Sequence, residues 1–559
     1  PRGGAPRHAN RARPEQIKLN QRIAACGAPR EVFEAIADAV EHGVELNSVN
    51  LATALHRVAR SGSASDFRHL RRSAEYQSLL TRVVTALQSP EGDFNPREIA
   101  NMAWGIAKAQ VPSIETFGVL SDAASASKLH SYKPQELSNT VWAFATVWNL
   151  CASPAVKAEF SPIVETMMAN TEAELLRRAA EAERGAGAGL SDFKPQEISN
   201  TLWGMATVGR DTAPVFDEMR DEILRRGLGD FVSQDMSNTV WAFVTSGQQA
   251  GALLDLVEEE VDQRGVSCFK SQELTNLVWA LAKVDFGSNR FFDNVSKDIL
   301  EHRQLSTFQS QELSNLVWGF STLMKRDAEL LHLVEREAVT RGLQGFKPQE
   351  LANMAWAFAK VGEPASQLFS TLELEILHRR DLSAFIPQEL SNVLWSFAKL
   401  GHGSPKLFET VGQDMLRRGL SCFKTQELSN AVWAHATTGN EGTKLFTSVE
   451  KEALKRGLHA FSSQDLSNMI WAFAKGEHVA AILFGQIQGQ FIRMAAESEE
   501  GGLSSYKAQE LSNLLWACAK TQHSAKGLFS MAESEAQGVL ARMDEEGEGG
   551  KGGEEEEEE

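Results

Sequence analysis

Hydrophobic and polar positions recur along this chain with a fixed period that tryptophan marks. Eleven of the 12 Trp residues follow one another at intervals of mostly 38 or 39 residues, with two longer intervals of 61 and 45. Phe or Tyr lies ten residues before each of these Trp residues, Glu or Asp six before and Asn three before. Such self-similarity inside one chain predicts an array of stacked structural repeats. The array contains Trp104, Trp142, Trp203, Trp241, Trp279, Trp318, Trp356, Trp395, Trp433, Trp471 and Trp516.

Each copy of the motif predicts a helix, which we call helix A. In FKPQEISNTLWGMAT (193–207), Pro suits the first helical turn, and the acid that follows is favoured there by the helix dipole. At about 100° per residue, the apolar residues five and one before the Trp and two after it share one face. The Gln seven before, the Asn, the Trp and the residue four after it share the other. Helix A therefore has a wide apolar face and a polar stripe bordered by Trp.

The remainder of each repeat predicts a second helix, helix B. Residues 404–420, SPKLFETVGQDMLRRGL, place apolar residues at helical spacing, basic residues in the last turn and Gly at the end. The predicted fold class is therefore all-α, an α-solenoid of about 11 two-helix repeats of 38–39 residues. Residues 46–59 match the motif weakly, with Leu46 in the Phe position and His56 in the Trp position, as expected of a capping repeat.

Interruptions of the pattern set the expected domain boundaries. The longest interval predicts an insertion at about 149–190, with a lengthened helix B and a flexible Gly-rich loop that lacks the features of a phosphate-binding loop. The 45-residue interval places extra residues around 497–502. We expect a basic, disordered N-terminal arm (1–30), a helical cap with the degenerate repeat (31–90), the solenoid (91–540) and an acidic, disordered tail (541–559).

Composition excludes several classes of protein. With 42% hydrophobic and 23% charged residues and no apolar run approaching about 18 residues, the chain is expected to fold without membrane insertion. Five scattered Cys residues form no metal-ligand pattern, and an odd count suits a reducing compartment. No motif of a nucleophile, phosphate loop or metalloprotease is present, so we expect no enzyme, no cofactor and no small-molecule substrate.

The net charge of −18 is unevenly distributed. The last 16 residues hold ten acids and one Lys, and the first 30 hold seven basic residues and one acid, which leaves the body at −15. Any site for a polyanion must therefore be a concentrated stripe on an otherwise acidic protein.

The repeats resemble a known family. YKPQELSNTVWAFAT (132–146) and its siblings, over about residues 91–540, are similar to the octotricopeptide repeat of organellar RNA-binding proteins and to repeats of the kinetoplastid mitochondrial RNA-editing substrate-binding complex. The resemblance implies binding of an organellar transcript for its processing, stability or translation, in a chloroplast or mitochondrion. A RAP-type domain is not recognisable, and the Pro-rich start of many octotricopeptide units is largely missing. Both departures argue against an enzymatic effector role.

The recurring Trp and Asn are ambiguous as RNA contacts. A position filled identically in every copy suits packing, whereas a position that reads different bases should vary. We therefore favour packing between repeats for the Trp over exposed stacking platforms. The Asn either bonds neighbouring helices in a ladder or contacts RNA. These residues are Asn101, Asn139, Asn200, Asn238, Asn276, Asn315, Asn353, Asn392, Asn430, Asn468 and Asn513.

Two basic series are candidates for phosphate contact. The position four after the Trp carries Thr in five copies and Lys in six, where preference for the helix end is the alternative explanation: Lys108, Lys283, Lys360, Lys399, Lys475 and Lys520. At the end of helix B, 15 residues before the Trp, an Arg would form a basic edge unless it caps the helix: Arg226, Arg264, Arg303, Arg341, Arg380, Arg418 and Arg456. The edge would be widened by Lys133, Lys194, Lys270, Lys347, Lys424 and Lys507.

Two functions remain open at this point. The first is a non-enzymatic adaptor that binds single-stranded RNA sequence-selectively, with possible protein partners. The second is a protein-binding scaffold of HEAT or armadillo type, which the acidic body favours. The Arg-rich opening resembles the end of a transit peptide, so we expect an organelle, with cytoplasm and nucleus as alternatives. Convergence of the basic series on one surface would favour RNA.

Overall fold

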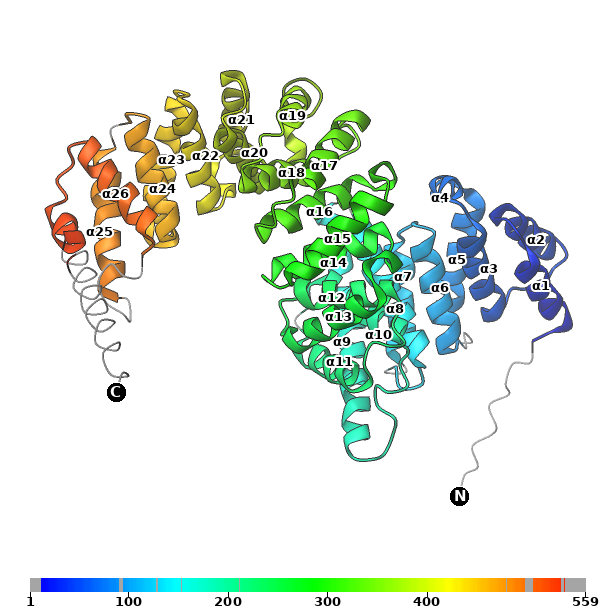
Figure 1. Cartoon of the computed structure of the whole chain (residues 1–559). Helices are drawn as coiled ribbons and strands as arrows, with labels where there is room; N and C mark the ends of the chain where they lie inside the picture. Colours follow the sequence, from blue (N-terminus) through cyan, green and yellow to red (C-terminus); the bar gives the residue numbers. More distant parts are fainter. Residues whose placement is uncertain are drawn as a thin grey trace, which may run out of the picture. The chain divides into compact units, whose positions relative to one another are not determined.

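The protein is a stack of helical hairpins, as the periodicity predicts (Figure 1). A computed structural model describes residues 12–89, 94–126, 129–151, 153–210, 212–478, 480–497, 506–533 and 537. Within these ranges every regular element is an α-helix or a short 3₁₀ helix, and none is a strand. The all-α solenoid is therefore confirmed.

The A helices recur once per repeat and form one row in each of two compact units, Pro1–Phe291 and Phe292–Glu559. In the first unit they are α3 (Ser48–Ser61), α6 (Pro96–Lys108), α8 (Pro134–Leu150), α10 (Pro195–Val208), α12 (Ser233–Thr245) and α14 (Ser271–Lys283). In the second they are α16 (Ser310–Thr322), α18 (Pro348–Val361), α20 (Pro387–Leu400), α22 (Thr425–Thr438), α24 (Ser463–Lys475) and α26 (Ala508–Lys520).

The remaining helices cap or separate the A helices. The N-terminal cap contains α1 (Pro14–Ala25), α2 (Pro29–Glu41), α4 (Ala64–Leu70) and α5 (Ala74–Gln88). The B helices are α7 (Ile114–Ala126), α9 (Pro154–Glu183), α11 (Ala213–Arg226), α13 (Gly251–Arg264), α15 (Asn289–His302), α17 (Ala328–Arg341), α19 (Ser366–His378), α21 (Pro405–Arg418), α23 (Thr443–Arg456) and α25 (Ala481–Glu497). Short 3₁₀ turns follow five of them: η1 (Val266–Cys268), η2 (Leu305–Thr307), η3 (Leu382–Ala384), η4 (Leu420–Cys422) and η5 (Leu458–Ala460).

The motif acid begins each A helix by a specific hydrogen bond. In α18 the backbone N–H of Lys347 donates to Glu350 Oε2 at 2.8 Å, and the same bond recurs in α22 from Lys424 to Glu427 at 2.7 Å. This satisfies a backbone donor that the helix itself leaves unpaired. The prediction that the acid lies in the first turn is confirmed, and its carboxylate is buried rather than displayed.

Successive A helices pack closely because two positions are always small. The hydroxyl of Ser314, four before its Trp, donates to the backbone oxygen of Glu350 in the next A helix at 3.1 Å. The position after the Trp is Gly, Ala or Ser in every copy. A Cβ at Gly105 would lie 2.7 Å from the backbone carbonyl of Leu55 in α3. The close contact between the backbones of adjacent A helices therefore requires small residues at these positions.

Gly105→Ala tests this contact. We expect the substitution to destabilise the first unit by about 1–3 kcal/mol, because the backbones of α3 and α6 must separate. The higher helix propensity of Ala would by itself raise the free energy of unfolding by about 1 kcal/mol, so the expected loss of stability has the opposite sign. Gly118→Ala in α7 is the matched control, since a Cβ there meets Ile163 Cδ1 at an ordinary 3.6 Å and should stabilise. Denaturant unfolding measures both, and equal effects would exclude the close contact.

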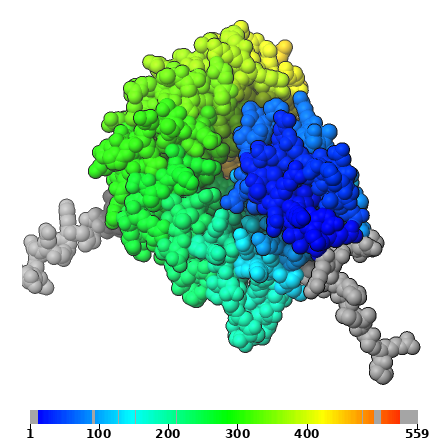
Figure 2. Space-filling model, turned by 90° about the vertical axis from the view of Figure 1, so that its right-hand side faces the viewer, coloured from blue at the N-terminus to red at the C-terminus, as the bar shows by residue number. Residues whose placement is uncertain are grey.

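The long insertion is a lengthened helix B, as predicted. Helix α9 has 30 residues, and it projects with its following loop beyond neighbouring helices of the first unit (Figures 1 and 2). Its buried Glu174 accepts hydrogen bonds from Arg177, Arg178 and His130. Burial alone would raise the pKa of Glu174, but these three donors outweigh it and hold the pKa at about 2.

The predicted disordered arm over 1–30 is wrong for its second half. Residues 14–25 form α1, and Gln16 Nε2 donates to the backbone oxygen of Glu45 at 2.9 Å. The arm carries Leu19 and Ile23, which are buried, so it adds apolar surface to the cap. The predicted acidic tail (541–559), the start of the arm and most of the extra residues at 497–502 lie outside the described residues.

Candidate nucleic-acid interface

One line of side chains runs along the exposed face of every A helix. Its positions lie seven and three before the Trp, at the Trp and four after it, a spacing that places all of them on one helical face. The first is exposed, the Asn is half-buried, the Trp is half-buried except for the exposed Trp516, and the last is exposed wherever it is Lys. We call these four positions, taken over the 11 copies, the A stripe. The exposed Gln position was missed as a candidate, although its recurrence at helical spacing from the Asn was visible.

The Trp side chains of the A stripe pack on one another and also remain open to solvent. In six pairs of consecutive copies the ring centroids lie 6.0 to 6.5 Å apart, with planes tilted by 29° to 34°, as in Trp104–Trp142 and Trp471–Trp516. His56 of the degenerate repeat extends this row, 5.0 Å from Trp104. The favoured packing role is therefore seen, while the half-buried rings keep an accessible edge.

The Asn side chains of the A stripe are mostly without protein partners. The interpretation of an Asn ladder bonding neighbouring helices is wrong for eight copies, whose amides make no hydrogen bond to any described residue: Asn101, Asn139, Asn200, Asn238, Asn353, Asn392, Asn430 and Asn468. Asn513 accepts a bond from Gln509 at 2.9 Å, and Asn276 and Asn315 have interactions of their own. The eight amides keep their full hydrogen-bonding capacity for a ligand.

The six candidate Lys residues lie on the A stripe. All six are exposed at the end of their helices. The ammonium groups of Lys283 and Lys360 lie 5.0 and 5.7 Å from the ring centroids of Trp279 and Trp356, and burial lowers the pKa of Lys283. Lys520 also pairs with Glu477 at 3.9 Å. The structure therefore brings Asn, Trp and Lys together on one surface.

The candidate Arg series is not part of that surface. In α17 Arg341 donates to the backbone oxygens of Phe308 and Leu305, at 2.7 and 2.8 Å, and to Glu337 on its own helix at 2.9 Å. Five other members bond the preceding loop in the same way and pair with an acid four or five residues earlier: Arg226, Arg264, Arg380, Arg418 and Arg456. Arg303 pairs with Asp298.

This corrects the expectation of a free basic edge. The guanidinium groups are largely buried and connect one repeat to the next by hydrogen bonds. The alternative of helix capping is therefore incomplete as well, because the bonds reach beyond the helix that carries each Arg. The acid four residues earlier, as in Glu337 and Arg341, was the sequence signal for this role. The Lys residues nine before the Trp do remain exposed, at the opposite end of the A helices.

Acidic side chains are absent from the A stripe in all 11 copies. The motif acids instead accept backbone hydrogen bonds in the first turn of the A helices, and many acids of the B helices pair with the Arg series. Burial raises the pKa of Asp235 and of Glu389 at two of those helix starts. The net negative charge of the body therefore does not extend to the A stripe, whose four positions carry only neutral or positive side chains.

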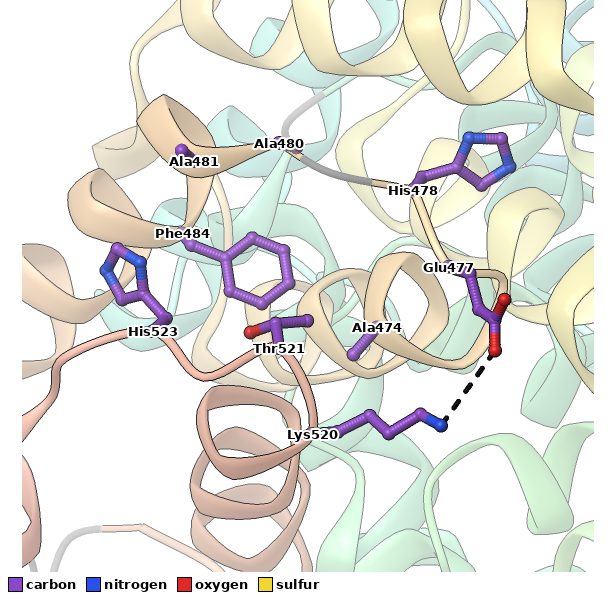
Figure 3. Close-up of a pocket in the computed structure, with 9 residues that line it drawn as sticks. All are labelled: Ala474, Glu477, His478, Ala480, Ala481, Phe484, Lys520, Thr521 and His523. Carbon is purple, nitrogen blue, oxygen red and sulfur yellow. Dashed lines mark ion pairs between the residues drawn. The ribbon is translucent and has the colours of Figure 1, made fainter.

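A small pocket lies at one end of the A stripe in the second unit. Phe484, His478 and His523 line a volume of about 280 Å³ beside Lys520 (Figure 3). His478 stacks on Phe446 at 4.0 Å, which accounts for its position. Across the described ranges, no group of three His, Cys, Asp or Glu residues is placed to hold a metal ion. Over the same ranges, no helix is both long and apolar enough to cross a membrane.

Comparison with known proteins identifies relatives of this array. A protein family of unknown function, DUF1601, matches residues 71–102 and 190–202. A chloroplastic RAP domain-containing protein of Oryza sativa subsp. japonica is 25% identical over 223 residues, 37% of this chain and 30% of that protein. The match thus spans less than a third of the rice protein's length.

Two solved structures align over most of the chain at low similarity. The pentatricopeptide repeat protein PPR10, in complex with an 18-nucleotide psaJ RNA element, aligns with a TM-score of 0.37 and 15% identity over 94% of this chain and 74% of its own. A circular tandem repeat protein gives a TM-score of 0.19 and 13% identity, over 93% and 98%.

The family match covers more of the chain. The family model of the RNA-editing substrate-binding complex 6 protein matches residues 205–526, more than half of the sequence. This span includes eight complete copies of the motif, from α12 to α26. The chain therefore belongs to the family of the RNA-editing substrate-binding complex 6 protein.

Proposed function

We propose that this protein binds single-stranded RNA along the A stripe, with sequence selectivity, and that it acts without enzymatic activity in the processing, stability or translation of organellar transcripts. The observation that carries the proposal is the composition of the stripe: eight Asn amides without a hydrogen bond to any described residue, partly exposed indoles and exposed Lys, with no acid in any copy. The family name and the chloroplastic rice relative support the RNA ligand and the organelle.

Each group of the A stripe matches one part of an unpaired strand. Amides hydrogen-bond the exposed edges of unstacked bases, aromatic rings stack on base faces, and ammonium groups neutralise phosphates. The bases of an RNA duplex are already paired and stacked, so such a stripe suits a single strand better. The resemblance to octotricopeptide repeats is consistent with this ligand and stays a prediction.

The alternative is a HEAT- or armadillo-like scaffold, in which the same amides would hold an extended acidic peptide. Crosslinking the protein in its host, followed by sequencing of bound RNA and identification of bound proteins, separates the two. Recovery of specific organellar transcripts supports the proposal. Recovery of proteins alone, with no enriched RNA, would reject it. Fractionation of host organelles with an antibody to the protein tests the location.

Replacing Lys360, Lys399 and Lys475 together by Thr tests the phosphate contacts. Thr occupies this position in other copies, so the fold should tolerate the change. Each lost contact removes about 0.7 from the slope of log affinity against log salt, so we expect the slope to fall by about 2. Fluorescence anisotropy with a labelled single-stranded RNA across a salt series measures it. The control is K406T/K444T/K451T, three exposed Lys residues on B helices of the same unit. An equal slope in both variants would contradict the assignment.

A further inference from the structure

The first end of the A stripe differs from all other copies. In the degenerate repeat, α3 places His56 in the Trp position and Arg60 four residues later. In the next A helix, α6, Arg97 replaces the Gln that ten other copies carry, and Lys108 ends the line. Three positively charged residues thus lie on the two helices where the row of aromatic rings begins, with Arg97 in the first turn of α6 and Lys108 at its last residue.

The geometry brings α3 and α6 into direct contact. The His56 ring lies 5.0 Å from the Trp104 ring with a tilt of 34°, so it continues the row of indoles. Gly105 allows this approach, because a Cβ there would collide with the carbonyl of Leu55. Arg60 and Lys108 occupy equivalent positions on adjacent helices and flank this ring pair on the same face.

The cations at this end lack partners. Arg60, Arg97 and Lys108 are exposed and make no ion pair or hydrogen bond with any described residue. Most B-helix arginines, by contrast, pair with an acid on their own helix, as Arg341 does with Glu337.

Charges that face His56 from both helices are positive. Burial and then Arg60, Arg57 and Arg97 lower the pKa of His56. Arg57 is partly engaged, since it donates to the backbone oxygen of Cys26 at 2.6 Å. A cluster of like charges without a counterion repels itself, and a bound anion relieves that cost.

We propose that Arg60, Arg97 and Lys108, with the stacked rings of His56 and Trp104, form a phosphate-binding anchor that fixes one end of the RNA on the A stripe. The proposal rests on the function proposed above. Guanidinium groups form paired hydrogen bonds with phosphate oxygens, and the adjacent rings offer a face to the neighbouring base. The phosphate belongs either to the interior of the strand or to its terminus.

The experiment compares the full chain with the variant R60Q/R97Q. One labelled single-stranded RNA is used in three forms, with a 5′-hydroxyl, a 5′-phosphate or a 3′-phosphate, across a salt series. The control is R68Q/R82Q, which removes two exposed arginines on α4 and α5 that have no partner among the described residues. Circular dichroism checks that both variants keep their helical content.

We expect R60Q/R97Q to reduce the salt slope by about 1.4, two contacts at about 0.7 each, and to weaken binding at least tenfold, while the control changes neither. A terminal phosphate is the ligand if the unmodified chain prefers one phosphorylated form and the variant loses that preference. An internal phosphate is the ligand if the slope falls equally for all three forms. Wild-type affinity and slope in the variant would overturn the anchor alone. Absence of binding to any RNA by the unmodified chain would overturn the proposed function itself.

Discussion

Replacing Asn353, Asn392 and Asn430 together by Ala is expected to weaken binding of single-stranded RNA by about 100-fold. Each amide makes no hydrogen bond to the described protein, so its loss removes about 1 kcal/mol of contact with the ligand and little else. The free energy of unfolding should therefore stay nearly constant. Fluorescence anisotropy measures the affinity, and denaturant unfolding monitored by circular dichroism measures the stability.

The neighbouring Ser residues provide a matched control. Ser314, Ser391 and Ser429 each precede the Asn position by one residue, are buried and donate to a backbone oxygen of the next A helix, at 3.1, 3.2 and 2.7 Å. Their replacement by Ala should lower stability and leave RNA affinity unchanged in the folded protein. If instead the Asn variant loses stability and keeps its affinity, the amides are structural and the A stripe is not the binding surface.

Arg341→Ala is expected to destabilise the second unit by about 3–5 kcal/mol, because it leaves the largely buried Glu337 and two loop carbonyls without their donor. Repeat arrays open locally, so hydrogen exchange should rise first in residues 305–308 and along α17. Mass spectrometry of exchanged peptides measures this. Arg341→Lys should not restore protection, since one ammonium group cannot reproduce the fork that reaches both carbonyls and the acid.

Arg336 on the same helix is the control for this prediction. It is exposed and has no partner among the described residues, so Arg336→Ala should change exchange very little. The folded Arg341 variant should also keep its affinity for RNA, because its guanidinium faces the preceding loop. A loss of affinity without added exchange would return the Arg series to the binding surface.

The Lys and Arg series differ in whether their charged groups already have partners within the protein, and this difference decides which series is available to a ligand. Lys360 and Arg341 lie in the same repeat and both looked suited to phosphate. Lys360 is exposed to solvent beside Trp356, whereas Arg341 donates its hydrogen bonds to backbone oxygens of the preceding loop. The distinction visible in the primary structure is the position four residues earlier, which is the acid Glu337 for Arg341 and Trp356 for Lys360.

The sequence by itself determined the repeat, both helices of each hairpin and the polar line that includes Asn and Lys. These features depend on neighbours within one helix, where period and capping are local properties. The weak repeat around His56 is visible for the same reason, whereas α1 lacks the motif, so the repeat pattern gives no sign of this helix.

Tertiary structure alone decided which polar groups are free. Arg341 finds its acceptors 33 and 36 residues earlier in the chain, across the stacking of one repeat on the next. Asn392 could bond a neighbouring helix or face solvent, and only the distance between packed helices settles that. Hydrogen bonds between repeats depend on how the hairpins stack, and the spacing of residues within one helix does not encode that stacking. Only the tertiary structure therefore shows that the Arg series bonds neighbouring repeats, whereas most Asn residues of the A stripe face solvent.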